Sequence, residues 1–328
     1  MRVTNNMLVN NMVYNLNQNL KTLEMLQYQK ATGKKFRVPS DDPIGVSKSL
    51  KFNTDISKLK QYERNAKDAM SWMTDTEAAL GEIGAVLHRA NELTIDAANG
   101  TKKSPEDLQK IKEEIDQLKE HLIQIGNTTY AGRHIFSGYK TDKPLLDEDG
   151  NYNIPLTMKD KDEEPKETKE IFEYNVGVSE RVKVNTLGGK VFGVAKYDEN
   201  ENLLGPPDYN SNVKSGDKPY LIAVFEELST ALDGGEVDKI QKAIGNVQKS
   251  HEQVLSVRAE VGAKMNRLEL TQNKLEKQIL SVKELLSYNE DVDLAEISMQ
   301  ISTAQNVYVS SLMTGAKIIQ PTLVEFLR

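Results

Sequence analysis

Apolar residues near the start of the chain recur at alternating steps of four and three positions. The members of this row are Val9, Val13, Leu16, Leu20 and Leu23. Such a row lines one face of an α-helix and is typical of helices that pair in coiled coils. It breaks at ATGKKFRVPSDDPIG (residues 31–45), where Gly33 favours a left-handed helix end and Pro39 cannot continue a helix. The sequence therefore predicts a first helix followed by a bend.

A second helix is predicted from about Pro43 to Ala98, with Asp41 or Asp42 as its cap and Pro43 in its first turn. Its row repeats every seven positions. The residues of that row are Leu59, Ala66, Met73, Leu80, Leu87 and Thr94. A third helix carries Leu108, Ile111, Ile115, Leu118, Leu122 and Ile125. Because the turn between these two helices is short, we expect them to lie antiparallel.

The second half of the chain contains the longest helical pattern, from about Glu236 to Asn289, which corresponds to about 80 Å of helix. Its seven-residue row is Ile240, Val247, Val254, Val261, Leu268, Leu275 and Val282. After NEDVD (residues 289–293), an acidic start leads into a final helix. Its row is Leu294, Ile297, Ile301, Ala304, Tyr308, Ser311, Gly315 and Ile318. The small residues in this row would let a neighbouring helix approach closely.

Residues 139–220 differ from the rest of the chain. They contain six of the ten prolines, a charge run and short alternating apolar stretches such as Val182-Lys183-Val184, which predict a small β-rich insert. The predicted fold is therefore mainly α: a long antiparallel coiled-coil bundle built from N- and C-terminal segments, with an inserted β-rich domain. The predicted parts are a terminal helical domain (1–40 with 291–328), a coiled-coil rod (41–138 with 221–290) and an outer domain (139–220).

Both ends of the chain are almost free of charge, although 28% of all residues are charged. No charged residue lies between Arg2 and Lys21, or between Glu296 and Lys317. Removing every charge over about five turns suits a helix that is covered on several sides, because Asn, Gln, Ser and Thr avoid the cost of burying an ion. We expect these ends to be frayed in the monomer and ordered after assembly; a disordered polar tail is the alternative.

Composition narrows the possible functions. The net charge of −7 argues against a nucleic acid or an anionic membrane as partner. No apolar run approaches the roughly 20 residues that span a bilayer, and we expect no Sec-type signal peptide. The absence of cysteine removes disulfides and thiol chemistry and is compatible with either redox compartment.

The sequence offers no catalytic constellation, so we expect no enzyme activity, cofactor or metal. The four histidines, His88, His121, His134 and His251, are scattered without metal-ligand spacing. DEDGNYN (residues 147–153) is rich in oxygen ligands but lacks the closing Glu of an EF-hand, so a turn is the better interpretation. Trp72 is expected in a core or a subunit interface.

Several stretches, in the right order, resemble the flagellin-like proteins. QKATGKKFRVPSDDPIG (residues 29–45) is similar to that family's signature near the bend between its terminal and rod domains. Its PSDDP form (residues 39–43) is closer to members at the hook–filament junction than to filament subunits. The other similar stretches are LHRANELTIDAANGT (87–101), NTTYAGRHIFSGYKTD (127–142), NEDVDLAEISMQI (289–301) and PTLVEFLR (321–328). The resemblance covers roughly residues 1–142 and 221–328, and the insert is weakly similar only at residues 182–193.

The resemblance implies a structural subunit of the bacterial flagellum, exported unfolded through the flagellar type III apparatus, that forms a ring between hook and filament. Its implied partners are further copies of itself, a neighbouring hook-associated protein, flagellin or filament-side subunits, and an export chaperone at the C-terminal region. The terminal helices would line the tube. The contact residues expected there are Met7, Val13, Leu16, Leu20, Leu23, Ile301, Tyr308, Leu312, Ile318 and Phe326. The residues expected at the domain bend are Gly33, Pro39, Asp41, Asp42 and Pro43.

Two alternatives stay open. The nearer one is a filament flagellin, a self-polymerising subunit. The other is a secreted coiled-coil enzyme or toxin with its active site in residues 139–220. That insert contains neither histidine nor cysteine, which makes the second alternative the weaker one.

Overall fold

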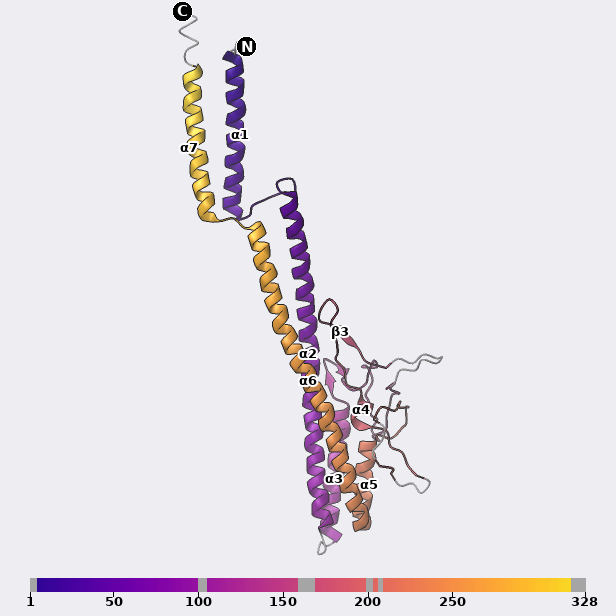
Figure 1. Cartoon of the computed structure of the whole chain (residues 1–328). Coiled ribbons are helices and arrows are strands. Elements are labelled where there is room, and N and C mark those ends of the chain that lie inside the picture. Colours follow the sequence, from indigo (N-terminus) through magenta and orange to yellow (C-terminus); the bar gives the residue numbers. More distant parts are fainter. Residues whose placement is uncertain (1–4, 100–104, 159–168, 199–202, 206–208, 320–328) are drawn as a thin grey trace, which may run out of the picture. The chain divides into compact units, whose positions relative to one another are not determined.

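The computed structural model describes residues 5–99, 105–158, 169–198, 203–205 and 209–319, and Figure 1 shows its elements. Its contacts fall into two units, Met1–Lys60 with Glu276–Arg328 and Gln61–Leu275. The described helices are α1 (Asn5–Thr32), α2 (Pro43–Ala98), α3 (Pro105–Gly126), α4 (Gly188–Phe192), α5 (Tyr220–Gly234), α6 (Val237–Glu290) and α7 (Leu294–Ile319). The predicted mainly α fold is confirmed, and the observed bounds of α2 and α6 lie within one residue of the predicted ones.

Local chemistry sets the helix ends where the sequence indicated them. Gly33 adopts a φ of +70° and donates its N–H to the carbonyl of Gln29 (2.8 Å), a left-handed end to α1. Of the two candidate aspartates, Asp42 caps α2, since its Oδ1 accepts the N–H groups of Ile44 and Gly45 at 3.1 and 2.9 Å. The predicted acidic start of α7 is also present, because Asp293 Oδ1 accepts the N–H of Ala295 at 2.8 Å.

In the unit Gln61–Leu275, long helix segments form an antiparallel bundle. Lys112 of α3 pairs with Asp233 near the end of α5, whereas Lys119, further along α3, pairs with Glu226 nearer the start of α5. The two helices therefore run antiparallel. Arg258 of α6 bonds Glu77 of α2 at 2.7 Å through Nε. Buried side chains from these helices meet in one core. Its largest fully buried residues include Met73, Leu80, Ile83, Leu87, Ile115, Leu122 and Phe225.

The insert is less strand-rich than its alternating pattern predicts. In the described part of 139–220, one ladder pairs β3 (Glu173–Asn175) with β4 (Arg181–Lys183), and single bridges join residues such as Leu146 and Tyr152. The other ladder, β1 (Thr129–Tyr130) with β2 (Arg133–His134), lies just before the insert. The buried apolar residues of the insert belong to the same cluster as those of the helices, so their burial does not require longer strands.

The insert shares its core with the helices. Tyr152, Leu187 and Phe192 are buried in the same apolar cluster as the bundle. Lys190 of α4 forms an ion pair with Glu260 of α6, and its carbonyl accepts the side-chain amide of Gln253 at 3.0 Å. Residues 147–153 form a turn, with Asp147 Oδ1 accepting the N–H of Asn151 at 2.7 Å. That turn agrees with the interpretation made from the sequence.

In the other unit, α1 and α7 lie antiparallel (Figure 1). Their buried contact is small: Leu26, Ile297 and Ile301, with the partly buried Leu23, Val292 and Ala304 packed against them. Further along the pair, Asn19 bonds Ser311 at 3.4 Å through their side chains. A Cβ at Gly315 would overlap the side chain of Met12, so the helices approach closely there. We call α1 and α7 the terminal pair.

Candidate assembly surface

The terminal pair exposes large apolar side chains along both of its helices. Val13 is 47% exposed on α1 and Leu312 is 42% exposed on α7. The other large apolar residues exposed on the pair are Met7, Leu8, Tyr14, Leu20, Met25, Leu294, Met299, Val307, Val309 and Met313. In a monomer, exposed apolar residues on this scale mark a surface that binds another protein.

A groove of about 510 Å³ runs between the two helices of the terminal pair. Its lining combines apolar side chains with neutral polar ones, and Glu296 is its one charged residue. The lining residues are Asn19, Thr22, Leu26, Glu296, Met299, Gln300, Thr303, Ala304 and Val307. Such a lining can receive another helix without burying a charge, because its amides and hydroxyls can form hydrogen bonds with the incoming chain.

The ten contact residues expected from the sequence fall into different environments. Met7, Val13, Leu20 and Leu312 are exposed, and Leu16 and Tyr308 are half-buried. Leu23 and Ile301 instead belong to the contact that α1 and α7 make with each other. The side chain of Ile318 and the whole of Phe326 lie outside the described residues. The exposed members are thus the ones free to contact a neighbour.

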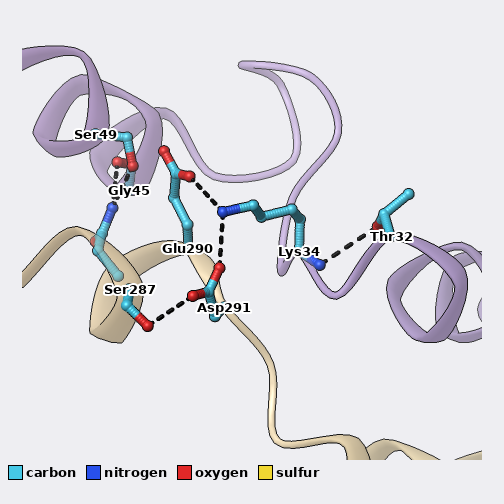
Figure 2. Close-up of polar contacts among 8 residues, drawn as sticks. Thr32, Lys34, Gly45, Ser49, Ser287, Glu290 and Asp291 are labelled. Atoms are coloured by element: carbon cyan, nitrogen blue, oxygen red, sulfur yellow. Dashed lines mark hydrogen bonds and ion pairs between the residues drawn. The ribbon is translucent and has the colours of Figure 1, made fainter. Parts of the chain in front are cut away.

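A second feature of this unit is the bend, the segment between α1 and α2 (residues 33–42), in which Lys34 lies beside Glu290 and Asp291 (Figure 2). The backbone of Lys35 donates to the carbonyl of Glu290 at 2.7 Å, and Val292 donates to Gly33 at 3.0 Å. The ammonium of Lys34 reaches Glu290 Oε2 at 2.9 Å and Asp291 Oδ1 at 2.7 Å. These contacts tie the residues that follow α1 to the end of α6 and to the linker that leads into α7.

The charges of the bend perturb one another. The hydrogen bond from Lys34, followed by one from Ser287 at 2.6 Å, lowers the pKa of Asp291. Reciprocally, hydrogen bonds to Asp291 and Glu290 raise the pKa of Lys34. The side chains of Lys34 and Asp291 are each 44% exposed. Water and salt therefore screen this pair, and its free energy is that of a surface ion pair.

Two further groups complete the bend. The side-chain amide of Asn289 donates to the carbonyl of Gly45 at 2.8 Å and to Ser49 Oγ at 2.7 Å, which joins the end of α6 to the start of α2 (Figure 2). Asp41 Oδ2 accepts the N–H groups of Arg37 and Val38, and these bonds lower the pKa of its carboxyl. Asp41 thus stabilises the loop, while Asp42 caps the helix. The hydrogen bonds of Asn289 were not foreseen, since no local pattern indicates a partner 240 residues away.

Among the residues that the structure describes, no group of three or more His, Asp or Glu side chains is placed to hold a metal ion. The structure does bring His88 and His251 together, with ring centroids 6.4 Å apart, although these residues are far apart in the sequence. Burial, and then the neighbouring His88, lower the pKa of His251. Two imidazoles without a third ligand do not make a metal site. Within the described helices, none combines the length and hydropathy required to cross a bilayer.

Comparisons with known proteins identify similar chains. Residues 3–141 match the family model of the bacterial flagellin N-terminal helical region, and residues 244–327 match that of its C-terminal helical region. The chain is 27% identical to flagellar hook-associated protein 3 of Escherichia coli over 312 residues, with 90% of this chain and 92% of that protein covered. It is also 27% identical to flagellin of Bacillus subtilis over 309 residues, with 94% and 92% covered.

The fold is also similar to that of a solved structure, the flagellar junction protein FlgL of Legionella pneumophila. The two share 18% sequence identity with a TM-score of 0.53, and the match covers 75% of this chain and all of the other. The identity is low, so this comparison supports the fold alone.

Proposed function

This chain belongs to the bacterial flagellin family, and from that premise we propose that it is a structural subunit that joins the hook and the filament of the flagellum. Its role is to hold two polymers together, which requires specific surfaces and no catalysis. The chain would work outside the cell, as part of the flagellum.

The observation that carries this proposal is the uncharged, apolar surface of the terminal pair. Val13 and Leu312 are exposed on helices that have few buried contacts of their own. Contact with α1 and α7 of adjacent copies would cover these side chains and remove apolar surface from water, which is favourable by about 25 cal/mol per Å². Residues 1–40 and 291–328 would then form the shared core of a ring.

The remaining segments suit the rest of that role. Residues 41–138 with 221–290 would form the rod, and its part within Gln61–Leu275 would act as a stiff spacer, because α2 and α6 share a buried core there. Residues 139–220 would face outward. Partners proposed beyond further copies are a neighbouring hook-associated protein, flagellin on the filament side, and an export chaperone that covers the C-terminal region before secretion through the type III apparatus.

Filament flagellin is the second candidate, favoured by the similarity to the Bacillus subtilis protein. Both candidates use the same terminal surface, so the surface does not separate them. Motifs favour the junction: the PSDDP form at residues 39–43 and AGRHIFSGYKT at residues 131–141.

Immuno-electron microscopy on isolated flagella with their hooks separates the two candidates. An antibody against residues 139–220 should label a single band where hook and filament meet. Label along the whole filament, or long filaments formed by the purified chain without hooks, would identify a flagellin instead.

Hydrogen exchange tests the role of the terminal pair. In the monomer, amides of α1 and α7 should exchange much faster than those of α2 between Gln61 and Ala98, since few buried contacts protect them. Once the chain is incorporated, the same amides should become protected. Firm protection of α1 and α7 in the monomer would mean that the pair is already complete and has no need of neighbours.

A further inference from the structure

A cleft of about 470 Å³ lies among α2, the β1–β2 hairpin and β3. Aromatic residues are 6% of the chain but half of the residues that line this cleft. They are Trp72, Tyr130, Tyr139, Phe172 and Tyr174. Its volume falls within the roughly 300–1,000 Å³ typical of small-molecule sites.

The aromatic rings hold one another in place. Trp72 makes edge-to-face contacts with Tyr130 and Phe172, with ring centroids 5.7 and 5.3 Å apart. Phe172 makes a similar contact with Tyr174 at 6.3 Å. Interlocked rings of this kind form a rigid apolar wall, which loses little conformational entropy when a ligand binds.

Hydrogen bonds fix the rim of the cleft. Tyr139 donates its hydroxyl to the carbonyl of Ile171 at 2.9 Å. Asn65 of α2 donates its side-chain amide to the carbonyl of Asn175 in β3 at 2.7 Å. The walls that come from the helix and from the insert are therefore joined directly, and the cleft is formed before any ligand arrives.

Polar groups in the cleft are left without partners among the described residues. Asp68 and Arg133 line it with exposed side chains, and neither forms a hydrogen bond or an ion pair with another described residue. The indole N–H of Trp72 is buried and also has no acceptor. A buried polar group without a partner is uncommon in folded proteins.

From this combination we propose that the cleft is a carbohydrate site that binds a pyranose sugar. A pyranose ring has an apolar C–H face that packs on aromatic rings and hydroxyls that both donate and accept hydrogen bonds. Asp68 accepts from such hydroxyls, and Arg133 donates to them. One negative and one positive side chain give the cleft no net charge, which suits a neutral sugar better than a cation or an anion.

The site does not depend on the role proposed for the terminal pair. Its residues all lie within Gln61–Leu275, and a subunit that never entered a ring would still contain it. The site adds a glycan-binding surface to a structural protein.

The test uses Trp72, the single tryptophan of the chain, whose fluorescence reports directly on the cleft. The purified full-length chain is titrated with methyl β-glucopyranoside and with N-acetylglucosamine. Sorbitol serves as a control with similar hydroxyls but no ring. A saturable change with at least one of the two sugars and none with sorbitol is expected.

Tyr174→Ala and Asp68→Asn should each weaken that affinity at least tenfold. Tyr288→Ala, on a side chain that is 79% exposed and outside the cleft, should leave it unchanged. Far-UV circular dichroism confirms that each variant folds. The proposal is overturned if neither sugar gives a saturable fluorescence change or if sorbitol gives the same change. It is also overturned if Tyr174→Ala binds the sugar with the affinity of the unsubstituted chain. A fluorescence change that depends only on protein concentration would overturn it too, since a second copy would then fill the cleft.

Discussion

The terminal pair and the bundle of Gln61–Leu275 are built from the same heptad-like rows, yet they bury very different interiors. In the bundle, residues such as Leu80, Leu122 and Phe225 are fully buried and surrounded by other apolar side chains. In the terminal pair, the buried contact consists of Leu26, Ile297 and Ile301. A row of apolar residues therefore predicts a helix face but not whether the chain itself covers that face.

Charge explains the difference. The bundle carries Lys, Arg and Glu on its outer faces, with pairs such as Arg258 and Glu77, so these faces are suited to contact with solvent. From residue 5 to residue 20, and from 297 to 316, the terminal pair has no charge on any face. A helix that avoids ions on all sides is suited to being enclosed by protein, and the described chain provides only one of those sides.

The largest effect is expected from placing a charge on the terminal surface. Val13→Asp and Leu312→Asp should each abolish incorporation into the flagellum, because a buried carboxylate without a partner costs several kcal/mol in every copy. The thermal unfolding of the monomer should barely change, since both side chains are exposed. Motility in a strain that lacks the native gene, together with circular dichroism of the purified chain, measures the two quantities.

Val178→Asp is the matched control, because that side chain is 91% exposed in the insert. It should assemble as the parent does. If Val13→Asp also assembles normally, or if it unfolds the monomer, the exposed face of α1 is not a contact with neighbours.

The next largest effect is a difference between the bundle and the terminal pair in how much a core substitution lowers the free energy of unfolding. Leu80→Ala should lower the free energy of unfolding by about 2–5 kcal/mol, because it leaves a cavity in a filled core. Leu26→Ala should leave that transition nearly unchanged, since its contact is small and belongs to the other unit. Urea unfolding followed by Trp72 fluorescence reports on the bundle alone. Equal losses in the two variants would show that the terminal pair and the bundle unfold as one.

Much of the fold was predictable because its signals are local. Gly33, Pro43 and Asp293 mark helix ends through backbone conformation and capping, which depend on the nearest few residues. The seven-residue step of α6 likewise follows from helix geometry alone. These features need no knowledge of distant segments.

What the sequence did not predict depends on distant partners. The length of the strands in the insert was overestimated, because Val182 of β4 is buried in the same apolar cluster as the helices, and that burial does not require a longer ladder. The hydrogen bonds of Asn289 and the aromatic cleft around Trp72 join segments separated by tens to hundreds of residues. Whether Ile301 faces its own chain or a neighbour was equally undetermined, since both positions suit an apolar residue.

A smaller effect tests the close approach of α1 and α7. Gly315→Ala would place a Cβ against the side chain of Met12, so the pair must loosen or Met12 must move. Amides of α7 should then exchange several-fold faster in the monomer. Met12→Ala in the same chain should restore the parent rate. Gly262→Ala is the matched control, because a Cβ there meets nothing within 4 Å, and it should stabilise α6 by about 0.5–1 kcal/mol. Unchanged exchange in Gly315→Ala would mean that the helices are not in close contact there.

The smallest effect is expected at the bend. The pKa of Asp291 is lowered from 3.8, so the stability from its pair is present above that value and is lost as the pH falls through the lower folded pKa. The pKa of Lys34 is raised from 10.5, so its contribution is present below that value and is lost as the pH rises through the higher folded pKa. Between about pH 5 and pH 10 the contribution of this pair to the stability of the bend should therefore be constant.

Lys34→Met should remove this contribution and speed the exchange of the Val292 amide, which donates to Gly33. The effect should stay below about 1 kcal/mol and shrink in 1 M salt, because both side chains are 44% exposed. Lys48→Met, on the exposed face of α2 in the same unit, removes the same charge without touching the bend. Hydrogen exchange at low and high salt, corrected for the intrinsic rate, measures both variants. Equal effects from the two substitutions would mean that net charge, and not the Lys34–Asp291 contact, stabilises the bend.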